Sequence, residues 1–142
     1  MSDNVKDLER DNLLHYDLTW KIIKAFYTVY NTLGYGFLEK VYENAMVMEL
    51  QRMGLLVSQQ QPVTVYYYGH IVGRYNSDLQ VENCVIVENK TADFLCPEDE
   101  YQLINYLKAT NIEVGLLLNF GKRPQFKRKV FNNKNKPLLN KF

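Results

Sequence analysis

A short apolar run with a charged end constrains the fold of this chain more than any other feature. Val85-Ile86-Val87 is β-branched throughout, which predicts a buried strand. The run leads directly into Glu88-Asn89-Lys90. Because burying an unpaired charge is costly, charged groups at the end of such a strand reach either water or a partner. The run therefore predicts a central sheet with an acid and a lysine at the end of one strand.

The hydrophobic period changes near Gly54, from helical to strand-like. Before it, apolar residues recur every three or four positions over 16–33 and 37–53, which predicts two amphipathic helices. After it, short runs rich in β-branched and aromatic residues predict strands. The remaining predicted elements are strands at 55–58, 62–68, 71–75, 78–82, 84–90, 113–120 and 127–131, with one helix at 97–110.

This order of elements predicts an α/β (α+β) fold with a mixed central β-sheet flanked by α-helices. The 142 residues are enough for one domain with a core, so we expect a single domain over 1–142. Within it, the polar residues 1–12 are predicted to be flexible, and 122–142 to form a basic C-terminal tail.

The composition excludes several classes of protein. Two cysteines, Cys84 and Cys96, are too few for a disulfide framework or a zinc site. With His15 and His70 as its two histidines, the chain also lacks a histidine-rich metal site. No apolar run approaches the roughly 20 residues needed to cross a bilayer, and the N-terminus is polar rather than signal-like. We therefore expect a cytoplasmic protein with reduced thiols and no membrane partner.

Asp78 precedes Glu88 at a spacing that fits a β-hairpin. If the loop is 82–84, Asp78 lies directly across from Glu88, with Cβ atoms about 5 Å apart. Glu88 and Lys90 then share a face of their strand, whereas a register slip of one residue separates the two acids. Opposed carboxylates repel unless a cation lies between them. The other interpretation is a solvated strand end with an incidental ion pair.

Two predicted helices supply further polar candidates. Glu39 and Tyr42 lie on one stripe of the second helix, where Glu39 either presents a carboxylate to a cation or to Lys90, or is a solvated residue that suits the helix dipole. Gln102 and Tyr106 share a face of the later helix. Their amide and phenol can orient a water or bind phosphate oxygens, although a core tyrosine with a surface hydroxyl is the simpler interpretation.

The net charge of +1 hides an uneven distribution. Residues 1–113 hold nine Lys/Arg and all sixteen Asp/Glu, giving −7, whereas residues 114–142 hold eight Lys/Arg and no acid, giving +8. Such a cluster is either a solvated basic tail or a binding surface for a phosphate backbone. The residues predicted to contact nucleic acid are Lys122, Arg123, Lys127, Arg128 and Lys129.

The motif Gly36-x-x-Glu39-x-x-Tyr42 at the start of a helix resembles the signature of the GxxExxY proteins, a group within the PD-(D/E)XK nuclease superfamily. The resemblance runs from 18 to 120. It implies a restriction-endonuclease-like core in which Asp78 is the first acid, Glu88 the second and Lys90 the lysine. Its pieces follow one another in family order: 36–50, 61–63, 67–69, 72–73, 78–79, 85–90, 102–108 and 114–121.

Two positions depart from the family pattern. Asn89 is polar, whereas family members usually carry a small or aliphatic residue between the second acid and the lysine. Asn76 lies where a basic residue is expected before the first acid, which predicts a weaker contact with substrate phosphate. Neither departure removes a catalytic side chain.

Together the residues and the resemblance predict a nuclease that uses Mg²⁺ (or Mn²⁺) to hydrolyse phosphodiester bonds in nucleic acid, with DNA favoured over RNA. Asp78 and Glu88, with the carbonyl of Asn89, would hold the metal, and Lys90 would activate or position the attacking water. Helical residues complete the predicted site: Glu39 and Gln102 as catalytic residues, Tyr42 and Tyr106 as lining. One alternative is a catalytically silent nucleic-acid-binding or protein-interaction module on the same fold. Another is a structural site, in which Glu88 and Lys90 form an ion pair and the apolar faces serve a homodimer.

Overall fold

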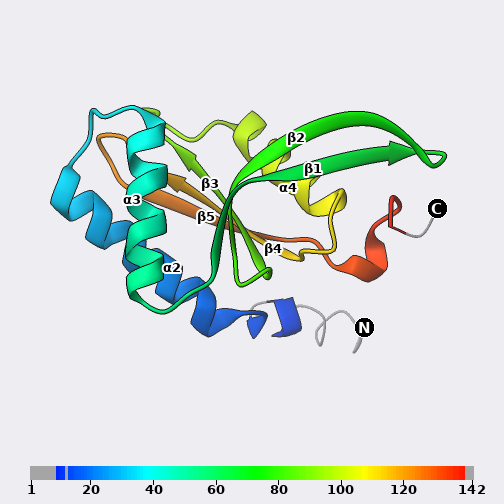
Figure 1. Cartoon of the computed structure of the whole chain (residues 1–142), viewed down its shortest axis with the longest axis horizontal. Helices are drawn as coiled ribbons and strands as arrows, with labels where there is room; N and C mark the ends of the chain where they lie inside the picture. The colour runs from blue at the N-terminus through cyan, green and yellow to red at the C-terminus, as the bar shows by residue number, and fades with distance from the viewer. Residues whose placement is uncertain (1–8, 12, 140–142) are drawn as a thin grey trace.

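A five-stranded sheet organises the chain, with its strands ordered β1-β2-β3-β4-β5 (Figure 1). The computed structural model describes residues 9–11 and 13–139. β3 and β4 are parallel, and every other neighbouring pair is antiparallel. The strands are β1 (Val57–Tyr67), β2 (His70–Val81), β3 (Val85–Lys90), β4 (Val114–Asn119) and β5 (Gln125–Val130).

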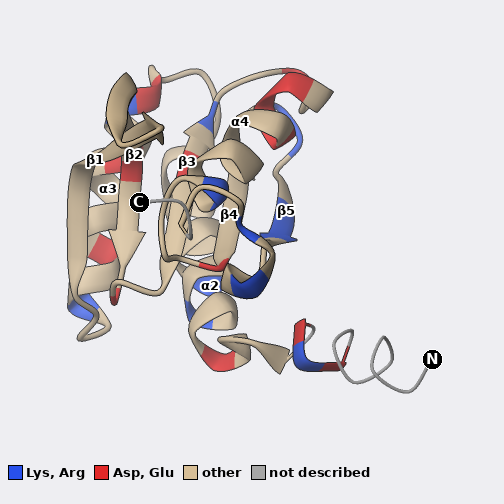
Figure 2. Ribbon diagram, turned by 90° about the vertical axis from the view of Figure 1, so that its right-hand side faces the viewer, with Lys and Arg blue, Asp and Glu red and all other residues tan. Residues whose placement is uncertain are grey.

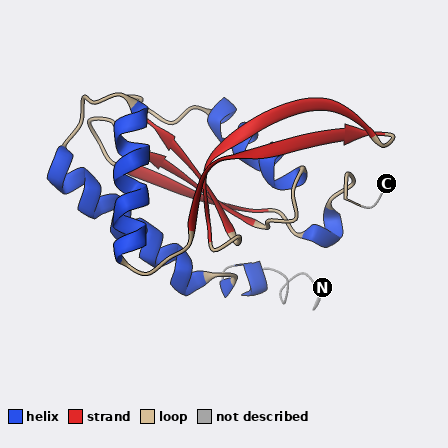
Figure 3. Ribbon diagram, viewed as in Figure 1, coloured by secondary structure: helices blue, strands red, loops and turns tan. Residues whose placement is uncertain are grey.

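Helices cover both faces of this sheet (Figure 3). α2 (Tyr16–Leu33) and α3 (Glu39–Arg52) pack on one face, where they share a core with alternate residues of β2, β3 and β4. α4 (Pro97–Lys108) packs on the other face in a smaller core that includes Ile86 and Leu117. A 3-10 turn, η1 (Asn133–Asn135), follows the last strand. The predicted mixed sheet flanked by helices is therefore confirmed.

The hairpin of β1 and β2 is longer than the sequence predicts. Each strand joins two predicted short strands, because pairing continues from Val57↔Val81 to Tyr67↔His70. Gln60 has a φ of 51° within β1, and the register of the pairing shifts between Val65 and Tyr66. The hairpin reaches well beyond the other strands as an arm beside α4 (Figure 1).

The register of β2 and β3 agrees with the prediction. Leu79 pairs with Val87, and Val81 with Val85, so the loop spans 82–84. Alternation places Val85 and Val87 in the core under α2 and α3, and Ile86 in the core under α4. Glu88 and Lys90 therefore share the α4 face.

The ends of β3 and β4 are tied together by a buried amide. Asn119 is fully buried; its Nδ2 donates to the carbonyl of Ala92 (2.8 Å), and its Oδ1 accepts from the amide of Ala92 (3.0 Å). The main-chain amide of Phe120 also donates to the carbonyl of Lys90 (2.8 Å). At Gly121 a Cβ would lie 2.0 Å from the Ala92 carbonyl oxygen, so the close approach requires glycine. The chain leaving β3 is thereby fixed in position.

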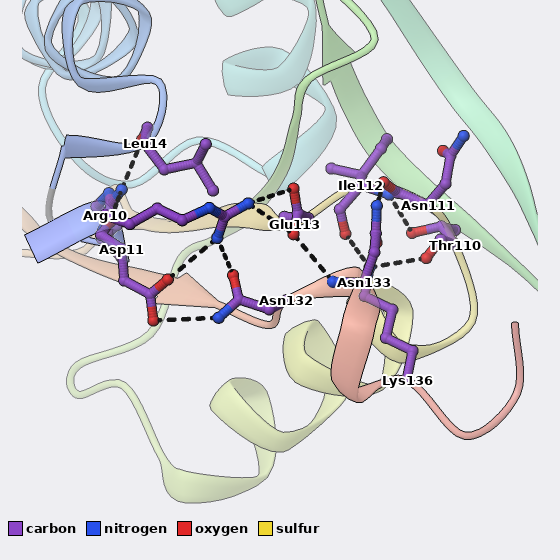
Figure 4. Close-up of polar contacts among 11 residues, drawn as sticks. Arg10, Asp11, Leu14, Thr110, Asn111, Ile112, Glu113, Asn132, Asn133 and Lys136 are labelled. Carbon is purple, nitrogen blue, oxygen red and sulfur yellow. Dashed lines mark hydrogen bonds and ion pairs between the residues drawn. The ribbon is translucent and has the colours of Figure 1, made fainter. Parts of the chain in front are cut away.

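Polar contacts attach the segment after β5 to the rest of the molecule (Figure 4). Lys136 is 1% exposed, and its ammonium donates to the carbonyls of Thr110 (2.8 Å) and Ile112 (2.6 Å). Arg10 donates to both carboxylate oxygens of Glu113 at 3.2 Å. Of the residues 1–12 predicted to be flexible, 1–8 and 12 lie outside the described residues.

No helix in the described part of the chain is long and apolar enough to cross a membrane.

Candidate active site

The two predicted acids lie where β2 and β3 separate, and each accepts a hydrogen bond from the other strand. The main-chain amide of Asp78 donates to Glu88 Oε2 (2.8 Å), and the amide of Asn89 donates to Asp78 Oδ2 (2.8 Å). The ladder of paired residues ends one position earlier, at Leu79↔Val87. The carboxylates thus replace main-chain partners at the point of separation, which holds the two acids side by side.

This proximity has an electrostatic consequence for Glu88. Its side chain is 6% exposed, and burial, followed by the negative charge of Asp78, raises its pKa to about 8. The charge of Lys90 acts in the opposite direction but is smaller. Near neutral pH Glu88 is therefore largely protonated, and a bound cation would favour its ionised form.

Lys90 lies on the same face and contacts a residue that sequence analysis did not select. Its ammonium is 3.8 Å from Asp99 Oδ1, with one quarter of its side chain exposed. Asp99 belongs to the first turn of α4, where its other oxygen accepts from the amide of Cys96 (3.4 Å) in a capping box. The available signal was an acid three residues after a helix cap, which by itself indicates a helix start and not a site.

Gln102 and Tyr106 complete the cluster from α4. Gln102 Nε2 donates to the Tyr106 hydroxyl at 2.9 Å. The pKa of Tyr106 is raised, mainly by burial and next by the charges of Glu88 and Asp78, which shows that the phenol lies beside the acids. The structure therefore brings together five predicted residues: Asp78, Glu88, Lys90, Gln102 and Tyr106.

Asn89 contributes its backbone to this face and its side chain to the opposite one. The side chain is 1% exposed in the α2–α3 core, and neither amide atom has a hydrogen-bond partner among the described residues. Alternation explains why family members usually carry an apolar residue here, because the middle position of the acid-x-Lys motif points into the core.

Among the described residues, neither candidate from α3 makes a hydrogen bond or ion pair with Asp78, Glu88 or Lys90. Tyr42 is fully buried; its ring stacks on Phe120 (4.5 Å between centroids), and its hydroxyl donates to the carbonyl of Gly34 (2.6 Å). Tyr42 therefore supports the core and does not line an open site. Glu39 is exposed at the first residue of α3 and makes no hydrogen bond or ion pair with the other described residues.

The cluster offers oxygen ligands for a divalent cation. Among the described residues, no three His, Cys, Asp or Glu side chains lie close enough together to hold a metal ion. The donor set is instead Asp78, Glu88 and the main-chain carbonyl of Asn89. Mg²⁺ suits such a set, because it binds through one or two carboxylates and keeps several waters. The raised pKa of Glu88 fits acids placed for a cation.

The basic residues near the C-terminus mostly contact this chain itself. Lys127 and Lys129 both pair with Glu100 (3.1 and 2.6 Å), which explains why acidic α4 lies beside basic β5 in Figure 2. Arg128 points the other way and donates to the carbonyls of Asp11 and Leu14 (2.7 Å each).

Lys122 and Arg123, the other two residues predicted to contact phosphate, lie outside β5. Lys122 and Arg123 are exposed in the connection from β4 to β5, and neither side chain has an ion-pair partner among the residues described. The hydroxyl of Tyr30 donates to the main-chain carbonyls of Gly121 (2.8 Å) and Lys122 (2.9 Å), which fixes the connection but leaves the basic side chains accessible.

Comparisons with known proteins agree with this fold. A family model described as the PD-(D/E)XK nuclease superfamily matches residues 16–130. The solved structure titled SSO0001 shares the fold at 15% identity and a TM-score of 0.53, over 87% of this chain and 63% of that one. An alkaline exonuclease (LHK-Exo) from Laribacter hongkongensis matches at 12% identity and a TM-score of 0.49, over 67% of this chain and 57% of that one. This chain thus spans less than two thirds of either structure, and no curated protein matches its sequence.

Proposed function

Since the chain belongs to the PD-(D/E)XK nuclease superfamily, we propose that it hydrolyses phosphodiester bonds in nucleic acid with Mg²⁺ or Mn²⁺. One observation carries the proposal. The acids of the motif, Asp78 and Glu88, bind each other's strands through hydrogen bonds of 2.8 Å, and Lys90 lies on the same face. A solvated strand end would not bury Glu88 beside a second carboxylate.

Each residue has a distinct role in this proposal. Asp78, Glu88 and the carbonyl of Asn89 hold the cation, which when bound polarises the phosphate and lowers the pKa of a coordinated water. Lys90, directed by Asp99, places its ammonium beside the attacking water and offsets the negative charge that develops on the phosphate. Gln102, held by the Tyr106 hydroxyl, has its side-chain carbonyl left to orient that water.

We also propose that the chain is a GxxExxY protein, on the contacts of the signature residues. Gly36 has a φ of 108°, a conformation that favours glycine. The Tyr42 hydroxyl joins both ends of the same turn, since it donates to Gly34 and accepts from the amide of Phe37 (3.2 Å). Two signature residues therefore form the turn into α3. The third, Glu39, is exposed at the first residue of α3, and we propose that it is an auxiliary metal ligand or orients Lys90.

Three further properties are predictions from the sequence alone. They are the preference for DNA over RNA, the cytoplasmic location and the possible homodimer.

The test is cleavage of labelled single-stranded and duplex oligonucleotides, DNA and RNA, by the full chain with Mg²⁺, Mn²⁺ or EDTA. We expect metal-dependent cleavage that Asp78→Asn and Glu88→Gln each abolish. Glu82→Gln, on the same hairpin but in its turn, is the matched control and should retain activity. Binding without cleavage under every metal condition would contradict the proposal and indicate the catalytically silent module.

Glu39 requires a separate comparison. Glu39→Gln should lower cleavage with little effect on stability. Glu43→Gln should do the reverse, because the Glu43 carboxylate is buried and accepts from Gln59 and Gln60 (2.8 Å each). Unchanged cleavage in Glu39→Gln would remove this residue from the site.

A further inference from the structure

A groove continues from the carboxylate cluster along α4. It has a volume of about 600 Å³ and lies between α4 and the arm formed by β1 and β2. Asp99 lines this groove and lies 3.8 Å from the ammonium of Lys90, so the groove adjoins the cluster. Val65 and Tyr75 form the wall on the side of the arm.

Aromatic rings supply much of the groove's surface. Tyr75 and Tyr101 are 51% and 63% exposed, although each lines a concave surface. Tyr106 lies deeper, with its ring centroid 5.8 Å from that of Tyr75. Exposed rings that line a groove are suitable for stacking against another planar group.

The charges of the groove oppose a phosphate there. Its charged lining residues are Glu98 and Asp99, which repel anions, and Lys108, whose ammonium lies 5.6 Å from the centroid of the Phe131 ring. The uncharged polar groups are the amides of Gln102 and Asn105, which can both donate and accept hydrogen bonds. An uncharged planar group with polar edges fits this lining, and a nucleobase is such a group.

We propose that this groove holds an unpaired nucleobase of the substrate strand, so that the protein acts on nucleic acid with a single-stranded region. The inference rests on the proposed nuclease function. A base within a duplex is stacked and paired, and so cannot enter a groove between a helix and a hairpin. With the base against Tyr75 and Tyr106, the adjoining backbone would run past Asp99 toward Lys90, whose ammonium lies 3.8 Å from the Asp99 carboxylate and offsets its charge.

The experiment measures binding by fluorescence anisotropy in EDTA, where no metal-dependent cleavage occurs. Three labelled ligands of equal length are compared: a single strand, the same strand with consecutive abasic positions, and a blunt duplex. The variant Tyr75→Val removes a ring of the groove, and Tyr67→Val removes a ring of the same arm outside it. Thermal unfolding checks that both variants fold.

We expect the wild type and Tyr67→Val to bind the single strand about tenfold more tightly than the abasic strand, the scale of one stacked base. Tyr75→Val should lose this difference while its affinity for the abasic strand and the duplex stays the same. Equal affinity of the wild type for both single strands, or an equal loss in both variants, would overturn the proposal.

The outcome is separable from that of the nuclease proposal. Cleavage that needs Asp78 and Glu88, with no preference for base-bearing strands, would support the nuclease proposal and contradict the groove proposal. A preference for base-bearing strands that depends on Tyr75, without cleavage in any metal, would support the groove proposal and contradict the nuclease proposal.

Discussion

The end of β3 and the whole of β5 are both rich in charged residues, but the charges are arranged in opposite ways. At the end of β3, two acids adjoin across a hairpin, and burial raises the pKa of Glu88 to about 8. Along β5, Lys127 and Lys129 share Glu100, whose pKa is lowered by these two hydrogen bonds. One region concentrates like charges and the other cancels opposite ones. The end of β3 therefore suits the proposed function, which needs a cation or a proton. The ion pairs of β5 instead hold the fold together.

The sharpest test of this contrast compares one lysine from each region. Lys90→Ala should lower the cleavage rate by about 10²–10⁴-fold, the usual contribution of a group that assists proton transfer. Lys129→Ala should lower it far less, because Lys129 contacts Glu100 and acts on the site only through the neighbouring Asp99. Single-turnover rates with saturating protein measure both. Equal losses in the two variants would contradict the contrast.

The pH dependence of stability should reveal the acid pair. Glu88 has a pKa of about 8 in the folded chain and 4.5 as its ordinary value. Between these values the folded state binds more protons than the unfolded state, so the free energy of unfolding falls as pH rises. Protonated Glu88 contributes its full stability below pH 4.5. This contribution is lost as the pH rises through about 8.

Urea titration of metal-free protein at about pH 5 and about pH 8 measures this loss, which we expect on the order of a few kcal/mol. Glu88→Gln should show a much smaller loss, and Glu82→Gln the loss of the wild type. Mg²⁺ should restore stability at the higher pH by binding the folded state. A wild-type pH dependence in Glu88→Gln would place the effect elsewhere.

Among the basic residues of 114–142, Lys136 should have the largest effect on the free energy of unfolding. Its substitution by Met keeps the volume of the side chain but leaves the carbonyls of Thr110 and Ile112 without their donor. We expect a loss of about 1–3 kcal/mol in the free energy of unfolding, with cleavage unchanged in the fraction that is folded. Lys122→Met, at an exposed position, is the matched control and should cost almost nothing.

The smallest expected effect concerns binding. Neutralising Lys122 and Arg123 should reduce the log–log salt slope of duplex binding by about two, since each phosphate contact contributes about 0.9. Neutralising Lys127 and Lys129 should leave the slope nearly unchanged, because both already contact Glu100. If the second pair lowers the slope as much as the first, β5 is a binding surface after all.

Sequence analysis recovered the parts of the site that depend on local register. Asp78 and Glu88 belong to one hairpin, so alternation and a three-residue loop determine their relation. Gln102 and Tyr106 share a helical face for a similarly local reason.

Contacts between distant segments could not be predicted in this way. Alternation places Arg128 on the opposite face of β5 from Lys127 and Lys129, but it does not show that carbonyls of Asp11 and Leu14, more than 110 residues earlier, bind it there. Asp99 was missed for the same reason, because its proximity to Lys90 depends on how α4 packs against the sheet. Tyr42 is a motif residue that was predicted to line the site, but its hydroxyl instead holds the turn before α3.

The two lysines on Glu100 have a consequence for the candidate active site. Glu100 adjoins Asp99 in the first turn of α4, so the ion pairs that hold Glu100 also restrain the carboxylate that contacts Lys90. Such pairs are partly solvated, and added salt weakens them. Ionic strength thus acts on this protein from within, through the alignment of α4, as well as through competition for the substrate backbone. The affinity for a short ligand with an uncharged backbone would isolate the internal component, since its binding releases no counterions.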